Sequence, residues 1–388
     1  MYGEADRQAM ERAIALARQG LYTTTPNPRV GCVIVRDGEV VGEGWHRRAG
    51  EPHAEVLALA EAGGRARGAT AYVTLEPCSH QGKTPPCCDR LIEAGVARVI
   101  AAMEDPNPLV NGQGLTRLRD AGIDVRCGLM AEEAAALNVG FISRMTRGRP
   151  WVRLKVATSL DGFIALPDGE SQWITGQQAR ADGHGWRAQA CAILTGSGTV
   201  RADDPSLTVR HVDTSRQPVR VLIDSQLAVD PGAAIFGPGE VWVIHARPED
   251  EDDPRQQALR LQGARLLSLP VGEHPGARTP GVRRRVDLPA ALRALGAAGF
   301  NELHVEAGAG LNAALMAAGC VDELLLYLAP AMLGAGLPAF ALPAVDGLAR
   351  RIRLDWLDVT PVGEDLRLRL RVLGTEADER PAIRPVSA

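Results

Sequence analysis

His53, Cys78 and Cys87 supply one imidazole and two thiolates, and Glu55 follows the histidine by two residues. These ligand types bind Zn²⁺, and three protein ligands leave the fourth tetrahedral position for water, whereas a structural site closes it with another Cys or His. A carboxylate beside that water can take up and deliver protons. The set therefore predicts a hydrolytic zinc centre in which Glu55 is the catalytic residue and not a ligand.

The elements around these residues are expected to bring them together. The apolar spacing predicts one helix that opens at His53 and another from Cys87 to Ala94, which Gly95 ends. The partial positive charge at a helix N-terminus stabilises a thiolate, so both helix starts suit a metal site. Cys88 is expected to be an ordinary buried thiol, because consecutive helical residues point about 100° apart and both cannot face one ion.

The first 150 residues alternate helical and strand patterns, which predicts a layered α/β domain with helices on both faces of a sheet. Helices are expected over residues 5–18, 53–62, 87–94, 112–121 and 131–145. Strands are expected over residues 31–35, 40–45, 70–75, 96–103 and 123–127.

The segment Arg147-Gly148-Arg149-Pro150 closes the last of these helices, and its basic, glycine-containing and proline-ended composition predicts a domain boundary. We expect one domain over residues 1–147, a second over 151–373, and a polar, proline-containing and disordered tail over 374–388. Strands of the second domain are expected over 151–157, 192–194, 219–223, 241–245, 265–269, 302–305, 323–328, 352–357 and 366–372. Its helices are expected over 176–190, 288–298 and 311–318.

Length and composition are those of an ordinary two-domain globular protein of 388 residues, 45% hydrophobic and 23% charged. The net charge of −4 gives no general attraction to nucleic acid or membrane, so a phosphate-bearing ligand must be held by local Lys and Arg. The polar N-terminal residues lack a signal-peptide core, and no apolar run could span a bilayer. Seven scattered cysteines fit a reducing compartment, so we expect a cytoplasmic protein.

Glycine-bearing turns follow two expected strands in the second half, at Thr195–Thr199 and at Glu306–Gly310. Such turns present backbone N–H groups at a helix start, where a phosphate can bind. Neither is a full dinucleotide-binding fingerprint, so taken alone they leave a dinucleotide site and a plain tight corner equally open.

The run from Thr74 to Cys87, with eight residues between its two cysteines, resembles the deaminase half of the bifunctional riboflavin-biosynthesis deaminase/reductase family. Runs over 154–162, 169–175, 197–205 and 327–330 resemble its reductase half. The resemblance implies a cytidine-deaminase-like three-layer α/β/α domain and a dihydrofolate-reductase-like α/β domain, with Zn²⁺ and NADPH as cofactors. It implies zinc-hydroxide deamination of 2,5-diamino-6-(5-phosphoribosylamino)pyrimidin-4(3H)-one, then NADPH reduction of the ribosyl group of 5-amino-6-(5-phosphoribosylamino)uracil to ribityl.

The same resemblance implies roles for individual residues, and a guanidinium fork suits the substrate phosphate. In the deaminase half the substrate contacts would be Asn27, His46, His80, Lys83, Asp105 and Asn107. In the reductase half they would be Lys155, Asp161, Ser171, Arg187, Leu207, Arg210 and Glu306. NADPH contacts would be Ala157, Trp173, Thr199, Asp203, Ser225, Gly308, Ala309 and Gly310. The chain departs from the family at Ala307, commonly glycine, and at Gly310, often larger.

Two other functions remain open at this point. A deaminase that edits nucleobases or nucleic acids is disfavoured by the acidic net charge, by having only four Tyr and five Phe to stack on bases, and by the long loop between the metal cysteines. A zinc-stabilised binding module with a degenerate second domain would need neither Glu55 nor an open zinc position. We expect a homo-oligomeric enzyme with a small-molecule substrate.

Overall fold

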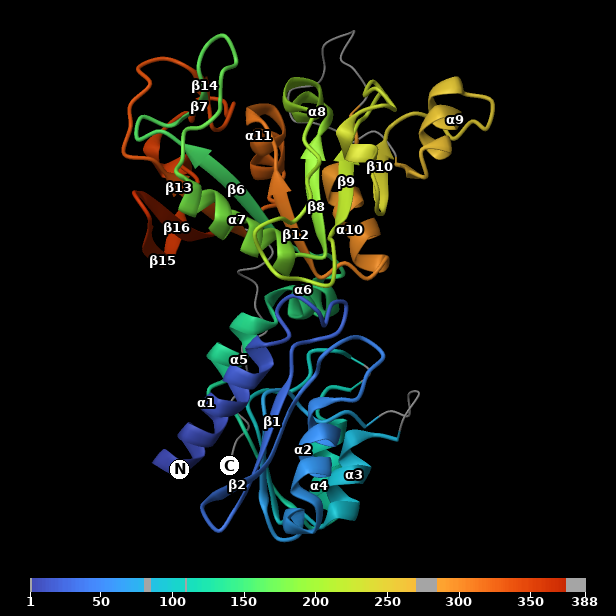
Figure 1. The fold of residues 1–388 in the computed structure, drawn as a ribbon, viewed down its shortest axis with the longest axis vertical. Helices are drawn as coiled ribbons and strands as arrows, with labels where there is room; N and C mark the ends of the chain where they lie inside the picture. The colour runs from blue at the N-terminus through green and yellow to red at the C-terminus, as the bar shows by residue number, and fades with distance from the viewer. Residues whose placement is uncertain (1, 80–84, 109, 270–284, 375–388) are drawn as a thin grey trace. The chain divides into compact units, whose positions relative to one another are not determined.

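The computed structural model describes residues 2–79, 85–108, 110–269 and 285–374. The chain divides into two compact units, the first ending at Arg147 and the second beginning at Gly148 (Figure 1). None of the helices in the described ranges combines the length and the apolar content that a membrane span requires. Most of the expected tail, residues 375–388, lies outside these ranges.

The first unit is built on a five-stranded sheet of order β2-β1-β3-β4-β5. β1 pairs antiparallel with β2 and β3, whereas β3, β4 and β5 run parallel. The strands are β1 (Gly31–Arg36), β2 (Glu39–Trp45), β3 (Thr70–Val73), β4 (Arg98–Ala101) and β5 (Asp124–Cys127). The helices are α1 (Glu4–Arg18), α2 (Ala54–Ala62), α3 (Cys87–Ala94), α4 (Gln113–Asp120), α5 (Ala131–Leu137) and α6 (Val139–Arg147).

Helices cover both faces of this sheet, because successive strand residues point to opposite sides. Cys32 and Ile34 of β1 belong to the core beneath α2, α3 and α4, whereas Val33 between them belongs to the core beneath α1, α5 and α6. Figure 1 shows α1 and α5 on one side of the sheet and α2, α3 and α4 on the other. The expected three-layer α/β/α arrangement is confirmed.

The expected single helix over 131–145 is wrong, because the chain breaks at Asn138 between α5 and α6. The Asn138 side chain is buried and forms two hydrogen bonds with the backbone of Arg29, accepting from N at 2.8 Å and donating to O at 2.9 Å. The buried backbone of Arg29, which leads into β1, needs those partners, so the side chain that supplies them interrupts the helix.

The second unit contains a nine-stranded sheet of order β11-β10-β9-β8-β12-β6-β13-β16-β15, in which β16 pairs antiparallel with both of its neighbours and the other pairs are parallel. Its strands are β6 (Trp151–Thr158), β8 (Ala192–Gly196), β9 (Val219–Ile223), β10 (Val241–His245), β11 (Arg265–Ser268), β12 (Glu302–Glu306), β13 (Glu323–Leu328), β15 (Leu354–Val362) and β16 (Asp365–Val372). The expected antiparallel strand pair near the end of the chain is confirmed as β15 and β16. A separate short pair joins β7 (Phe163–Ala165) to β14 (Leu337–Pro338).

Helices again lie on both faces of the large sheet. The helices are α7 (Gln177–Gln189), α8 (Ser197–Asp203), α9 (Pro254–Leu261), α10 (Leu288–Ala297) and α11 (Ala309–Ala317). On β8, Leu194 packs in the core that holds α10 and α11, whereas Ile193 packs in the core that holds α8 and α9. The sequence analysis missed α8 and α9, whose short apolar patterns are weak. Because most strands are parallel, the loops at their carboxyl ends gather along one edge of the sheet.

Candidate active sites

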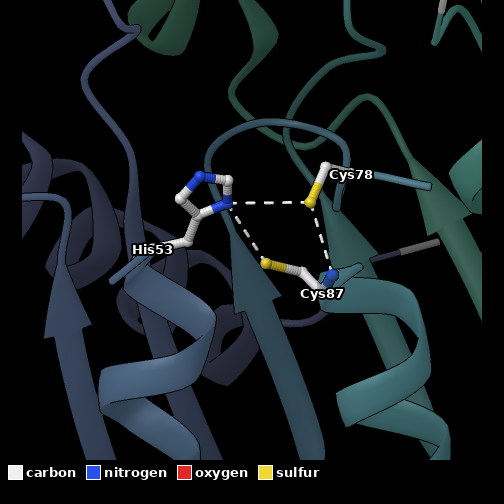
Figure 2. A group of neighbouring side chains, drawn as sticks. All are labelled: His53, Cys78 and Cys87. Atoms are coloured by element: carbon white, nitrogen blue, oxygen red, sulfur yellow. Dashed lines mark hydrogen bonds between the residues drawn. The ribbon is translucent and has the colours of Figure 1, made fainter. Parts of the chain in front are cut away.

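His53, Cys78 and Cys87 lie together in the first unit, with one ligand atom from each inside a common 4.8 Å limit. Figure 2 shows one imidazole nitrogen pointing at both thiols, and this Nδ1 lies 3.6 Å from Cys78 Sγ and 3.3 Å from Cys87 Sγ. Zn–S bonds of about 2.3 Å and a Zn–N bond of about 2.0 Å at a tetrahedral angle would separate N and S by about 3.5 Å. The donor set and its spacing therefore fit a zinc ion.

Two of the ligands lie at helix starts, and the third lies in the loop after a strand. His53 is the N-cap of α2, Cys87 is the first residue of α3, and Cys78 follows β3 by five residues. The Cys87 backbone N–H donates to Cys78 Sγ at 3.3 Å, which ties the two thiols together at the start of α3. A hydrogen bond from the Cys87 thiol, with smaller help from His53, lowers the pKa of Cys78 to about 4, so this sulfur favours the thiolate form that binds metal.

Cys88 takes no part in the cluster, as expected from its position on the helix. It is fully buried, and its thiol donates to the carbonyl oxygens of Pro77 at 3.2 Å and Gly114 at 3.5 Å. Among the described residues the group of possible metal ligands contains only the three expected ones. With three protein ligands among the residues that the structure describes, the cluster differs from a structural zinc site closed by a fourth Cys or His.

Glu55 lies in the first turn of α2 beside the ligands and is only 3% exposed. Burial raises the pKa of its carboxyl group, and the neighbouring His53 charge opposes that shift. A buried carboxyl group against an open metal position is placed to exchange a proton with whatever occupies that position.

Asn27 and His46 meet next to the cluster. The His46 ring packs edge-on against the His53 ring at a centroid distance of 5.4 Å. His46 Nδ1 lies 3.2 Å from the Pro52 carbonyl oxygen and Nε2 lies 3.1 Å from Asn27 Nδ2. Burial lowers the pKa of His46, so the neutral ring donates from Nδ1 to Pro52 and accepts from the Asn27 amide. These two hydrogen bonds of His46 orient Asn27 beside the metal ligands.

Glu76 is a buried anchor that the sequence analysis missed. One carboxylate oxygen accepts from the backbone N–H of Asp105 at 3.0 Å and of Gly112 at 2.9 Å, and the other accepts from Gly114 at 2.8 Å and Leu115 at 3.3 Å. Asp105 in turn accepts from the Asn107 N–H at 2.8 Å. Glu76 therefore holds the segment that carries two expected substrate contacts, and two further ones, His80 and Lys83, lie outside the described residues.

The second unit has a pocket of about 700 Å³ at the α7 face of its sheet. Nine residues expected to bind substrate or cofactor line it. They are Lys155, Ala157, Ser171, Trp173, Arg187, Asp203, Leu207, Arg210 and Glu306. The structure thus brings together residues separated by up to 151 positions in the sequence, from Lys155 to Glu306.

Arg187 and Glu306 form a two-pronged ion pair in this pocket, with Nε–Oε1 2.5 Å and Nη2–Oε2 2.8 Å. Burial alone would raise the pKa of Glu306, but the Arg187 guanidinium holds it well below its usual range. Burial also lowers the pKa of Lys155, which faces the Tyr327 ring. Three of the five Arg187 N–H groups are used, because Nη1 also donates to the Thr208 carbonyl at 3.0 Å.

Arg210 is more open than Arg187. Its Nη1 donates to Ser206 Oγ at 3.1 Å and Thr208 Oγ1 at 3.3 Å, which aims the guanidinium while leaving other N–H groups available. Trp173, 68% exposed, lies under the Arg180 guanidinium at 4.4 Å, so one ring face is covered. The pocket therefore combines a cationic end with an aromatic surface.

Six expected contacts do not line the pocket. Asp161 accepts from the Ser159 hydroxyl and the backbone of Leu333 and Gly334, which fastens one loop to another. Ser225 Oγ accepts from the Val286 N–H at 3.1 Å. The other four are Thr199, Gly308, Ala309 and Gly310.

Thr199, in the first turn of α8, joins the start of this helix to the turn after β12, because its Oγ1 accepts the Gly308 N–H at 3.0 Å. Gly308 is the N-cap of α11, and a Cβ at Gly310 would meet no atom within 4 Å. The helix start thus offers backbone N–H groups beside open space, which fits an anionic group such as a cofactor phosphate.

His184 and His211 also line the pocket and were missed. The spacing of three residues between His184 and Arg187 on a helix was a usable signal, since it places both on one face. Glu76 gave no such signal, because all its partners are backbone groups 29 to 39 residues away.

Comparison with known proteins accounts for both sites. The zinc-binding region of cytidine and deoxycytidylate deaminases matches residues 3–103, and the RibD C-terminal domain matches residues 150–368. The chain is 50% identical to the riboflavin biosynthesis protein RibD of Escherichia coli, over 94% of this chain and 99% of that protein. The chain belongs to the RibD family. Its expected fold, its membership of riboflavin biosynthesis and its bifunctional deaminase and reductase character are thereby confirmed.

Solved RibD structures show the same architecture. The Acinetobacter baumannii RibD structure is 42% identical, covers 95% of this chain and 99% of its own, and superposes with a TM-score of 0.85. A Thermotoga maritima protein described as a diaminohydroxyphosphoribosylaminopyrimidine deaminase/5-amino-6-(5-phosphoribosylamino)uracil reductase is 33% identical, with the same coverage and a TM-score of 0.81. Membership of the RibD family excludes both alternatives left open by the sequence.

Proposed function

We propose that the first unit deaminates 2,5-diamino-6-(5-phosphoribosylamino)pyrimidin-4(3H)-one and that the second reduces the ribosyl group of 5-amino-6-(5-phosphoribosylamino)uracil with NADPH. The observation that carries the proposal is the three-ligand cluster of His53, Cys78 and Cys87 with buried Glu55 beside it. An open metal position with a proton carrier is what hydrolysis of a ring amidine needs.

Zinc, when bound by these three residues, lowers the pKa of a coordinated water toward neutrality. Glu55 takes the proton released and delivers it to the departing amine, a role that suits a carboxyl group whose pKa burial has raised. Asn27, oriented by His46, holds the pyrimidine beside the metal ligands. Asp105 and Asn107 bind the substrate from the segment that Glu76 holds. His80 and Lys83 complete the contacts with the ring, the ribose and the phosphate.

In the second unit, Arg187 and Arg210 bind the substrate phosphate, and the other proposed contacts position the ribose and pyrimidine. Glu306 sets the geometry of Arg187 through the ion pair and is expected to contact the opened ribose with its remaining acceptor positions. The other proposed substrate contacts are Lys155, Asp161, Ser171 and Leu207. Of these, Asp161 acts through the loop that its carboxylate holds.

NADPH, when bound, supplies the hydride. The start of α11 at Gly308, Ala309 and Gly310 would hold a cofactor phosphate, with Thr199 fixing the turn. Trp173 offers an exposed ring face for stacking. The remaining proposed cofactor contacts are Ala157, Asp203 and Ser225.

We further propose a homo-oligomer in which β15 is covered. This edge strand carries Trp356 at 65% and Val359 at 54% exposure, and an exposed apolar edge invites pairing. Light scattering of the purified protein tests the assembly, and a monomer would refute it.

The seven cysteines form no disulfide, which fits a cytoplasmic protein.

The function is tested by supplying the diaminopyrimidinone phosphoribosyl substrate with and without NADPH. Ammonia release should occur in both cases. When NADPH is present, its oxidation should begin after ammonia release. Arg210→Ala should raise the reductase KM for substrate roughly ten- to a hundredfold, and leave the KM for NADPH and deamination unchanged. Arg255→Ala, at an exposed arginine of α9, is the matched control. NADPH oxidation without ammonia release from the first substrate would refute the proposed order.

A further inference from the structure

His184 and Arg187 lie one turn apart on α7 and both line the pocket of the second unit. Each forms a hydrogen bond with the same loop. Arg187 donates to the Thr208 carbonyl, and His184 Nδ1 lies 3.0 Å from the backbone N of Arg210. Two neighbouring side chains of one helix therefore hold the backbone of the loop that carries the exposed guanidinium of Arg210.

The contact with Arg210 decides which nitrogen of His184 carries the proton. A backbone N–H can only donate, so Nδ1 must be unprotonated to accept it, and the neutral ring then carries its hydrogen on Nε2. Burial, together with the charges of Arg187 and Arg210, lowers the pKa of His184 to about 4. The ring is therefore a neutral Nε2–H donor at physiological pH.

The Nε2 atom is available to a ligand. It has no hydrogen-bond partner within the described part of the chain, and the atom keeps some exposed surface. The ring itself cannot turn freely, because His211 packs edge-on against it at 5.0 Å and the His184 side chain is only 7% exposed. A fixed donor thus lies close to both arginines of the pocket, because the charges of Arg187 and Arg210 both act on the ring.

We propose that His184 is a positioning residue and the third hydrogen-bond donor of the site that holds the substrate phosphate. Its Nδ1 fixes the backbone of Arg210, and its Nε2–H donates to a phosphate oxygen. The inference rests on the proposed function, because it requires the phosphate to lie between Arg187 and Arg210. Because His184 is a neutral donor, it adds a hydrogen bond to the phosphate beside the two cations. The ion pair between Arg187 and Glu306 stays intact.

Two substitutions separate the two roles. In His184→Asn the amide oxygen can take the place of Nδ1 and accept from Arg210, but no donor reaches the position of Nε2. In His184→Gln an N–H can reach that position, but the Arg210 N–H loses its acceptor. Ribose 5-phosphate is the probe, measured by calorimetry and as an inhibitor of the reductase, and ammonia release by the first unit of the same sample reports intact protein.

His184→Asn is expected to weaken ribose 5-phosphate binding and raise the reductase KM about tenfold, with kcat, and kcat/KM for the dephosphorylated substrate, unchanged. His184→Gln should show a smaller loss. Affinity within twofold of wild type in both variants, or an equal loss with phosphorylated and dephosphorylated substrates, would overturn the proposal. If Arg210→Ala also leaves ribose 5-phosphate affinity unchanged, the phosphate site itself is misplaced and the proposed function of this pocket fails with it.

Discussion

Replacement of Glu76 by glutamine should loosen the segment that lies beside the metal cluster. Each carboxylate oxygen accepts two backbone N–H groups, from Asp105 and Gly112 on one side and from Gly114 and Leu115 on the other. In the amide one oxygen remains an acceptor, but the other position becomes an NH₂ group that faces two donors. Two buried N–H groups then lack partners, and each unsatisfied group costs about 1–3 kcal/mol.

The expected destabilisation of this segment is therefore about 2–6 kcal/mol, or at least a thirtyfold rise in its open population. Hydrogen exchange of the amides over 104–115, followed by mass spectrometry, measures that rise directly. Glu133→Gln makes the same charge change at an exposed position of α5 and should leave the exchange unchanged. The deaminase KM should rise with little loss of bound zinc, because Asp105 moves and the ligands do not. Exchange within twofold of wild type would refute the anchoring role of Glu76.

Three further outcomes are expected. Cys88→Ser should keep about one equivalent of zinc, and loss of the metal would show that Cys88 is a ligand. Burial alone would raise the pKa of Glu323, but Arg153 and Arg369 lower it to about 2, so its contribution to stability is complete above about pH 4.5 and is lost as the pH falls toward 2. Glu323→Gln should flatten that acid dependence in unfolding of the second unit, and an unchanged profile would contradict it. Residues 1–147 and 151–373, expressed separately, should each fold, with zinc in the first, and insoluble fragments would place the boundary elsewhere.

The parts of the site that could be predicted from sequence are those with short-range chemical signatures. The zinc ligands and Glu55 were predicted because metal binding demands particular side chains at helix and strand ends, and these ends have their own local signals. The alternation of helices and strands likewise predicted the layers of the first unit.

The parts that could not be predicted depend on partners far away in the chain. The helix break at Asn138 exists to satisfy the backbone of Arg29, 109 residues earlier. The role of His184 depends on a backbone N–H 26 residues later, and that of Glu76 on four such groups. Backbone donors have no sequence identity, so no residue pattern marks these contacts before the fold is known.

The central claim is that Glu55 moves protons at a zinc site and does not hold the metal. Purified Glu55→Gln protein should contain about one equivalent of zinc by mass spectrometry and release ammonia roughly 10²–10⁴-fold more slowly than wild type. It should still oxidise NADPH at the normal rate when 5-amino-6-(5-phosphoribosylamino)uracil is supplied directly. Near-normal ammonia release, or loss of the zinc, would contradict the account.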